Sequence, residues 1–106
     1  MKVGTDIVKI SRLEGAKDSF IDGVLSLNEK EEYQKRNKKA EFLAGHYAAK
    51  EAFLKALGTG LSGARLKEIE VHYEKSGAPY LIYQGKRYEM SISHDGDYAI
   101  SVVLIP

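Results

Sequence analysis

A run of nineteen residues in the middle of the chain is apolar on nearly every side when it is drawn as a helix. The run covers residues 39–57, KAEFLAGHYAAKEAFLKAL, contains no proline and is followed by Gly58. Abundant Ala and Leu with a glycine stop are typical of a helix. A helix that is apolar all round is a buried one. We therefore expect a central buried helix over these residues.

The polar residues of this helix are informative, because a charge on a buried helix needs a partner or a ligand. At ideal helical spacing Glu51 lies beside Tyr47, with Lys55 one turn further on. A surface ion pair between Glu51 and Lys55 would explain both residues. The apolar surroundings of Glu51 make a functional role an equally good interpretation. His46 and Lys50 share another side of the helix.

Before and after this helix, shorter patterns predict the other elements. Residues 3–10, VGTDIVKI, resemble an apolar strand followed by a short helix, and residues 26–36 resemble a largely exposed helix that opens with a capping box of Ser26 and Glu29. Further strands are expected at residues 66–73, 79–83 and 87–105, the last as a hairpin around 95–97. These elements predict an α+β fold with the long central helix packed on a mostly antiparallel sheet of about four or five strands.

Length and composition narrow the class of protein. The 106 residues are enough for one domain, residues 1–106. No apolar run approaches the length of a membrane span, and the first residues, MKVGTDIVKI, lack a signal-peptide layout, so we expect a cytoplasmic protein. The absence of cysteine excludes disulfides and thiolate sites. A net charge of +1 argues against a nucleic-acid partner.

Four features outside the helix are candidates for function, each with a structural alternative. Asp6 interrupts a strand, where it could cap the helix that follows or belong to a metal site with Glu51. Arg12 lies in a locally basic stretch that could be only a solvated face. His94 ends a strand, where a hydrogen-bonded corner is the commoner role. The glycines of residues 58–63 could form turns or approach a phosphate, and turns are favoured.

Three segments together resemble a known family. They are VGTDIV at residues 3–8, FLAGHYAAKEAFLKALGTG at 42–60 and SISHD at 91–95. In order, spacing and total length they are similar to the holo-[acyl-carrier-protein] synthases, the small class of 4′-phosphopantetheinyl transferases. The resemblance covers nearly the whole chain, and its AAKEAFLKALGTG core is highly specific.

The resemblance implies an activity and a partner. Such enzymes move the 4′-phosphopantetheine arm of coenzyme A, their co-substrate, to a serine of apo acyl carrier protein and release adenosine 3′,5′-bisphosphate. Members of the family look Mg²⁺-dependent and homotrimeric, with each active site between two subunits. The resemblance therefore implies that this chain needs Mg²⁺ and forms a homotrimer.

The resemblance also implies roles for particular residues. Asp6 and Glu51 match the metal-binding acids, and Glu51 would take the proton of the attacking serine. Lys55 matches the lysine that touches the phosphates. His94 matches the histidine of the strand-end motif on the coenzyme A side, and Arg12 matches a basic residue that meets the acidic carrier.

The chain departs from the family pattern in two places. His46 stands where the family more often has an arginine associated with the 3′-phosphate of coenzyme A. Because a histidine is mostly neutral at pH 7, we expect weaker discrimination between coenzyme A and its 3′-dephospho form. Residues 83–91 are short where relatives commonly carry an extra helix, which could alter subunit contacts or access of coenzyme A.

Other functions fit the same residues. A metal-dependent nucleotide pyrophosphatase would use the two acids without a carrier protein. A non-catalytic carrier-protein-binding module would use only the basic stretch around Arg12. An RNA-binding domain fits less well, since the strands lack a basic and aromatic platform.

Overall fold

The computed structural model describes residues 1–58 and 65–106 of the chain. Glycine-rich residues 59–64, for which turns were expected, lie outside the described residues. In chain order the elements are β1 (Lys2–Lys9), the 3-10 helix η1 (Ile10–Leu13), α1 (Asp18–Val24), α2 (Leu27–Lys35), α3 (Lys39–Leu57), the 3-10 helix η2 (Leu66–Glu68), β2 (Glu70–Tyr73), β3 (Pro79–Tyr83), β4 (Lys86–Asp95) and β5 (Tyr98–Ile105).

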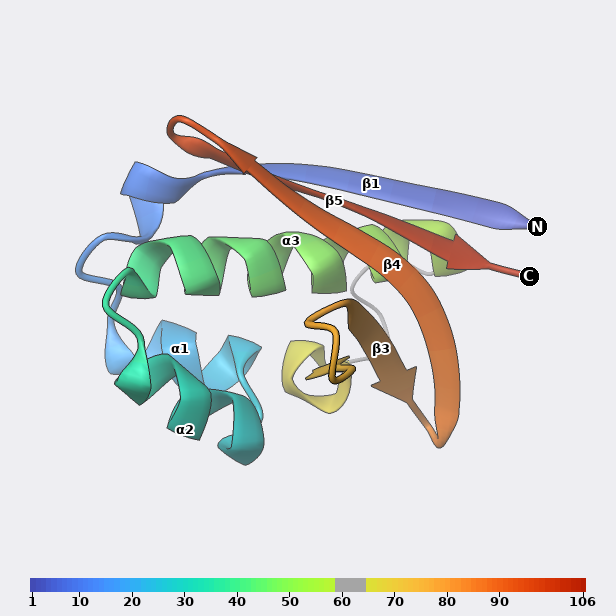
Figure 1. The fold of residues 1–106 in the computed structure, drawn as a ribbon, viewed down its shortest axis with the longest axis horizontal. Coiled ribbons are helices and arrows are strands. Elements are labelled where there is room, and N and C mark those ends of the chain that lie inside the picture. The colour runs from blue at the N-terminus through green and yellow to red at the C-terminus, as the bar shows by residue number, and fades with distance from the viewer. Residues whose placement is uncertain (59–64) are drawn as a thin grey trace.

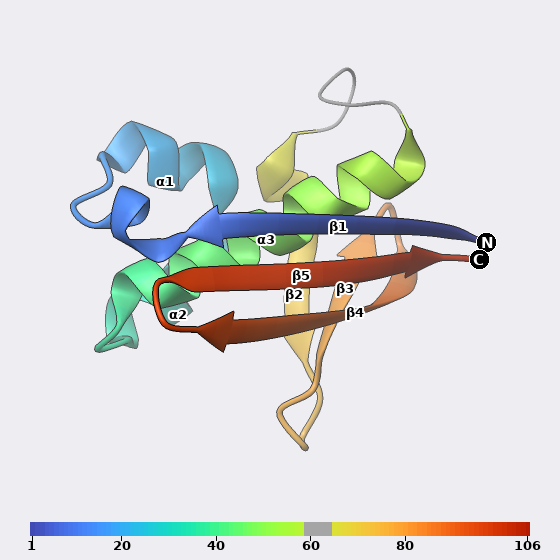
Figure 2. The same ribbon diagram turned by 90° about the horizontal axis from the view of Figure 1, so that it is seen from above.

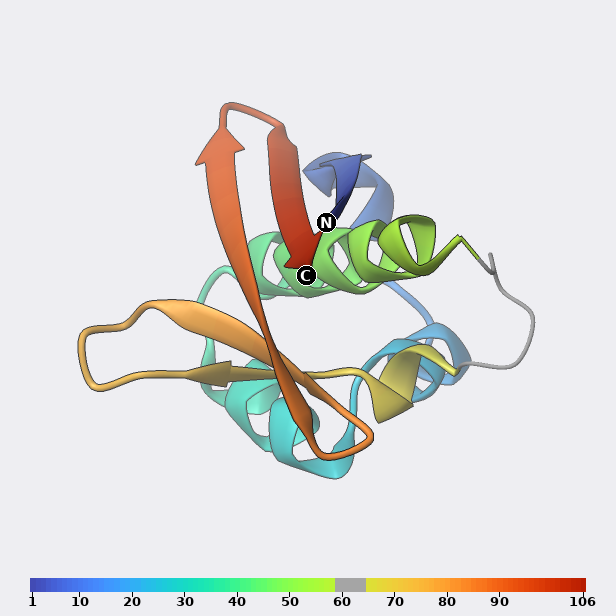
Figure 3. The ribbon, with the colours of Figure 1, turned by 90° about the vertical axis from the view of Figure 1, so that its right-hand side faces the viewer.

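The strands form one antiparallel sheet in the order β1-β5-β4-β3-β2. In Figure 1, α3 runs beneath β1, β5 and β4, while α1 and α2 lie on the other side of the helix. Figure 2, seen from above, shows β1 and β5 side by side in front of α3. Seen along the helix, the sheet curls around it, so that β2 and β3 flank α3 on a second side (Figure 3). The predicted α+β class is therefore confirmed.

The central helix matches its prediction closely. α3 covers residues 39–57, and Gly58 ends it in the left-handed conformation with a φ of 77°. Its Ala-rich sides allow close packing, and at Gly4 of β1 the contact is between backbones. A Cβ atom on Gly4 would lie 1.8 Å from the carbonyl oxygen of Ala52. The glycine is therefore required for β1 to lie directly on α3.

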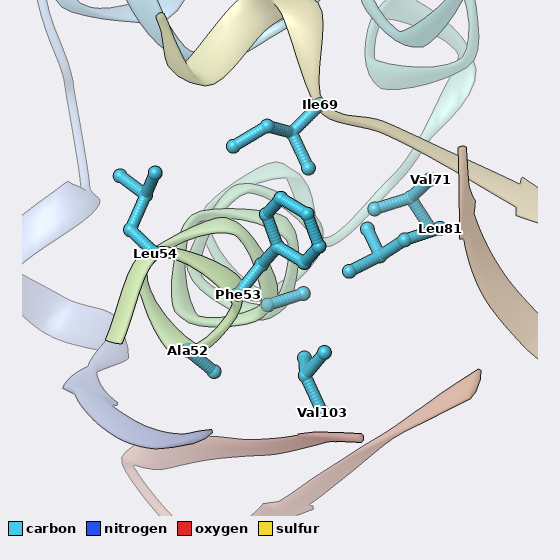
Figure 4. Packing of buried hydrophobic residues seen from close by; sticks show 8 residues of the cluster. Ala52, Phe53, Leu54, Ile69, Val71, Leu81 and Val103 are labelled. Carbon is cyan, nitrogen blue, oxygen red and sulfur yellow. The ribbon is translucent and has the colours of Figure 1, made fainter. Parts of the chain in front are cut away.

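The main apolar cluster surrounds Phe53 of α3 (Figure 4). Side chains from η2, β2, β3 and β5 enclose this ring, among them Ile69, Leu81 and Val103, all fully buried. Tyr83 of β3 meets the ring edge-on, with centroids 5.3 Å apart. The helix is thus fixed along its length between two arms of the curled sheet.

The predicted capping box of α2 is confirmed, but it does more than cap. The Ser26 backbone N–H donates to the Glu29 carboxylate at 2.8 Å, and the Glu29 N–H donates to Ser26 Oγ at 3.3 Å. α2 is mostly exposed, as expected, yet Glu29 and Tyr33 are buried. Glu29 is buried because it pairs with Lys50 of α3, with Nζ 2.5 Å from Oε1.

Some sequence-based boundaries were wrong. α1 was not predicted, and residues 66–68 form a 3-10 turn instead of the start of a strand. Asp95 belongs to β4 and is paired with Tyr98, so the hairpin turn contains only Gly96 and Asp97. Within the described residues, no helix is long and apolar enough to cross a bilayer.

Candidate active site

Asp6 lies in the middle of β1, opposite Ser101 of β5. Its side chain contacts Lys55 of α3, whose Nζ donates to Asp6 Oδ1 at 2.8 Å and to the Thr5 carbonyl at 3.1 Å. The alternative in which Asp6 caps the following helix is wrong, because Lys9 occupies that position. The close contact between β1 and α3 at Gly4 brings these two charges together.

Glu51 lies in the same cavity as Asp6. This cavity, which we call the acid cavity, has a volume of about 330 Å³ and is bounded by β1, η1, α1 and α3. It is lined by Asp6, Ile7, Val8, Arg12, Leu13, Phe20, Tyr47 and Glu51. Burial and then the charge of Asp6 raise the pKa of Glu51, while Lys55 and the Tyr47 hydroxyl lower it. Lys55 forms its ion pair with Asp6, so the alternative in which it forms a surface pair with Glu51 is not the arrangement found. Glu51 is therefore the less neutralised of the two acids.

The donor set of this cavity fits a small hard cation. Two carboxylates share the cavity, and their repulsion contributes to the raised pKa of Glu51. Among the described residues there is no cluster of three or more carboxylate or imidazole side chains that could hold a metal by itself. Mg²⁺ is commonly held by one or two carboxylates, with water and substrate phosphates completing its shell. Asp6 and Glu51 could hold it in this way.

Two residues of the cavity were not identified as site residues from the sequence. Tyr47 was recognised only as an apolar neighbour of Glu51, although a tyrosine four residues before a glutamate is within its reach on a helix. Burial and the charges of Glu51 and Asp6 raise the pKa of Tyr47, so its hydroxyl keeps its proton as a donor. Phe20 of the unpredicted α1 packs against the Tyr47 ring at 5.4 Å.

Arg12 lies on η1 and lines the acid cavity at its edge. The residue is exposed, and the helix that carries it follows β1 directly. The structure therefore brings together four of the predicted residues. They are Asp6, Arg12, Glu51 and Lys55.

The two candidate histidines lie in a second cavity of about 500 Å³. Its lining includes the cationic side chains of Arg36 and Lys38, together with Glu41, His46 and His94. None of the described residues lines both this cavity and the acid cavity. From the strand register, with β5 between β1 and β4, the backbones of Asp6 and His94 are roughly 12 Å apart.

His46 is buried and neutral. Only 2% of it is exposed. Its Nδ1 lies 2.8 Å from the Phe42 carbonyl, to which it donates, and its Nε2 accepts from the Tyr73 hydroxyl at 3.0 Å. Burial lowers the pKa of His46 to about 4. Both ring nitrogens are thus occupied, and the ring carries no charge at neutral pH.

His94 is half-exposed and lies over α3 where the helix has a glycine. A Cβ atom on Gly45 would lie 3.2 Å from His94 Nε2 and 3.1 Å from Ile92 Cγ2, so a larger residue would push the histidine outward. The Nδ1 atom lies 3.8 Å from the Glu41 carboxylate. Gly45 therefore sets the depth of His94 in the cavity.

Two acids and an arginine line one cavity, a lysine pairs with one of the acids, and cationic side chains line a second cavity. Such an arrangement suits a protein that acts on a phosphorylated substrate. The model of the 4′-phosphopantetheinyl transferase superfamily matches residues 2–103. The chain belongs to this superfamily, which confirms the resemblance found in its sequence.

The similar proteins narrow the family further. Curated relatives named holo-[acyl-carrier-protein] synthase include one from Clostridium kluyveri, 39% identical and covering 97% of this chain and 87% of the relative, and one from Enterococcus faecalis, 41% identical with 97% and 94% covered. Crystal structures of such synthases from Bacillus anthracis, in complex with CoA (3′,5′-ADP), and from Helicobacter pylori, in complex with coenzyme A, have TM-scores of 0.86 and 0.87. They are 36% and 29% identical, covering 96% and 98% of this chain and 92% and 99% of theirs.

Proposed function

We propose that this chain, acting as one domain over residues 1–106, is a cytoplasmic enzyme that transfers the 4′-phosphopantetheine arm of coenzyme A to a serine of apo acyl carrier protein. The observation that supports this most is the acid cavity, which Asp6 and Glu51 line and where Lys55 pairs with Asp6, in a chain similar to holo-[acyl-carrier-protein] synthases. The serine oxygen forms a bond to the phosphorus next to the pantetheine arm. The bond from that phosphorus to the other phosphate breaks, and adenosine 3′,5′-bisphosphate leaves.

Glu51 is the general base in this proposal. Without metal, burial together with Asp6 raises the pKa of Glu51, whereas a Mg²⁺ held by the same carboxylate would lower it and keep the base ionised, ready to accept a proton. The Tyr47 hydroxyl holds the carboxylate in place. Glu51 takes the proton of the serine hydroxyl, directly or through water, as the oxygen attacks.

Lys55 offsets the charge that develops on the departing phosphate. Its side chain is 57% exposed, so the ammonium can leave Asp6 and follow the phosphate without exposing a buried group. Asp6 and Glu51 are the residues that would hold Mg²⁺, and a bound Mg²⁺ would neutralise part of the pyrophosphate charge.

The second cavity suits the nucleotide end of coenzyme A. Lys38 and His94 line it, and a cationic lining attracts phosphate. His46 has no free N–H and no charge, so it provides no ionic contact to a 3′-phosphate. The expected result is that kcat/KM differs by less than about tenfold between coenzyme A and its 3′-dephospho form at pH 8. A strong preference for the 3′-phosphate would contradict this role of His46.

A homotrimer with sites between subunits is also proposed. The outer face of β1 and β5 is exposed and apolar, with a patch formed by Val3, Ile7, Tyr98, Ile100, Val102 and Leu104. A patch of this kind favours burial against another chain. A second copy placed there could bring one chain's acid cavity to another's His94 cavity. The short turn at Gln84–Gly85 leaves β3 and β4 without the extra helix of relatives.

Light scattering after gel filtration tests the trimer. The wild-type chain is expected at three times its monomer mass, and Ile7→Glu, which places a charge in the apolar patch, is expected as a monomer. Ile7 is 62% exposed, so the variant should fold. A monomeric wild-type chain would contradict the assembly but not the chemistry.

One assay tests the activity: purified chain, coenzyme A, Mg²⁺ and apo carrier protein, read by mass spectrometry. The carrier should gain the mass of the arm, and removal of Mg²⁺ with a chelator should stop the reaction. Breakdown of coenzyme A with an unmodified carrier would instead indicate a nucleotide pyrophosphatase. Carrier binding with neither reaction would indicate a binding module. Glu31→Gln, on the exposed face of α2, is a matched control for Glu51→Gln.

A further inference from the structure

The turn between β4 and β5 is tied to the start of η1, 86 residues earlier in the chain. Asp97 makes three contacts there. Its Oδ1 accepts from the Ser11 backbone N–H at 2.9 Å, its Oδ2 accepts from Ser11 Oγ at 2.7 Å, and its own carbonyl accepts from the Ile10 N–H at 2.7 Å. In Figure 1 this turn lies directly above the segment that follows β1.

These contacts supply what a short helix lacks. The first N–H groups of any helix have no partner within it and must find one elsewhere. Lys9, at the N-terminal boundary of η1, provides no side-chain cap, as judged from the described residues. Asp97 therefore takes the role of the cap from across the fold, with a carboxylate in place of a neutral acceptor.

The apolar contacts of η1 do not fix the part that carries Arg12. Ile10 is buried with Val8, Ala40 and Ala99, and Leu13 packs on the same cluster, whereas Ser11 and Arg12 are exposed. The helix is therefore held at its two ends by packing. The bond pair from Asp97 to Ser11 is the polar contact that sets the orientation of the exposed middle.

We propose that Asp97 is a positioning residue for Arg12 in the binding of the carrier protein. The inference rests on the proposed function, in which Arg12 at the edge of the acid cavity meets an acidic carrier. It makes a prediction opposite to that of simple electrostatics. Removing an acidic side chain near the docking surface of an acidic partner should by charge alone lower the KM for that partner. Loss of positioning should raise it.

Steady-state kinetics with the apo carrier test the proposal. Asp97→Ala removes both side-chain hydrogen bonds to Ser11, and we expect the KM for the carrier to rise about fivefold or more, with kcat changed less than twofold. Ser11→Ala removes only the hydroxyl contact and no charge, so its rise in KM should be smaller but in the same direction. Circular dichroism and thermal melting establish that both variants are folded.

A double-mutant cycle with Arg12→Ala separates positioning from a general structural effect. If Asp97 acts through Arg12, Asp97→Ala causes no further rise in KM once Arg12 is alanine. Asp95→Asn, two residues earlier in the same hairpin, controls for loss of charge and should leave KM unchanged or lower it.

Three results would overturn the inference: an unchanged or lower KM in Asp97→Ala, full additivity with Arg12→Ala, or a rise of equal size in Asp95→Asn. In each of these cases wild-type transfer is intact, so the proposed function survives. A wild-type chain that neither modifies nor binds the carrier overturns the proposed function and removes the partner on which this inference depends.

Discussion

Two lysines of α3, five residues apart, each pair with a carboxylate, but the two ion pairs differ in burial and in their surroundings. Lys50 meets Glu29 at 2.5 Å with both side chains buried, and Lys55 meets Asp6 at 2.8 Å with its own side chain 57% exposed. The first pair joins four elements of the fold. The second lies at an open cavity beside another acid. A lysine–carboxylate pair thus stabilises the fold in the first place, and in the second it belongs to the proposed active site.

The buried pair has partners on every side. Lys50 also donates to the Val24 carbonyl at 2.6 Å, and Glu29 accepts from the backbone N–H groups of Ser26 and Val71, each at 2.8 Å. Burial lowers the pKa of Lys50, and the charge of Glu29 opposes that shift. Through these hydrogen bonds the pair holds α1, α2, α3 and β2 together. Because both side chains are buried and already bonded, neither is available to bind a ligand.

The exposed Lys55–Asp6 pair lies beside a second acid, Glu51, that has no ion-pair partner of its own among the described residues. Asp6 has Lys55, but Glu51 in the same cavity gains only partial compensation, and its pKa is raised. A cavity with an incompletely neutralised acid favours a cation or a proton. That imbalance is what distinguishes the site from the structural pair.

The largest expected effect is on turnover. Glu51→Gln should lower kcat for transfer by about 10²- to 10⁴-fold, because the amide cannot accept the serine proton. The midpoint of thermal unfolding should stay the same or rise, since the charge removed is one whose pKa is raised in the folded state. Mass spectrometry of the carrier and calorimetry measure the two quantities. Near-normal turnover in the folded variant would exclude Glu51 as the base.

The buried pair should show the reverse. Lys50→Met keeps the volume but leaves the Glu29 charge unpaired in the interior, so the free energy of unfolding should fall by about 3–5 kcal/mol. Urea denaturation measures this change. At temperatures where the variant remains folded, kcat should be close to the wild-type value. A loss of turnover without a loss of stability would show that the comparison between the two pairs is wrong.

Acid should destabilise the fold through His46. Its pKa is about 4 in the folded chain, against about 6.5 unfolded, so the unfolded chain binds more protons between these pH values. The stability is present above pH 6.5 and is lost as pH falls toward 4, by about 3 kcal/mol. His46→Gln, which can still donate to Phe42 and accept from Tyr73, should flatten the dependence. His72→Gln, at a half-exposed site, should not.

The smallest effect is expected at the exposed lysine. Lys55→Met should change the free energy of unfolding by less than about 1 kcal/mol, because exposed ion pairs contribute little to stability. Its effect should appear in transfer instead. Equal destabilisation by Lys55→Met and Lys50→Met in parallel urea titrations would remove the distinction between the two ion pairs.

Local patterns were sufficient for most of the elements. The Ala-rich run with Gly58 predicted α3 to the residue, and the spacing of Ser26 and Glu29 predicted the start of α2, because the signals for both lie within one or two turns. α1 was missed because its seven residues, DSFIDGV, are too few for a periodic pattern and contain a glycine.

Contacts between distant residues could not be obtained in the same way. Lys50 is 21 residues from Glu29, Lys55 is 49 from Asp6, and Asp97 is 86 from Ser11. Nothing in the local sequence of these residues indicates which partner each will meet. The residues alone left Asp6 between a helix cap and a metal site with Glu51, and the family resemblance favoured the metal site. That the two acids line one cavity could be seen only in the fold.

Gly4 has no side chain, and at that point the main chains of β1 and α3 are in contact. Asp6 is two residues further along this strand, and Glu51 immediately precedes Ala52 on the helix. Their separation is therefore set by peptide groups instead of by core side chains of adjustable size. Evolution or redesign could therefore replace many core side chains and still keep the spacing between the backbones that carry Asp6 and Glu51.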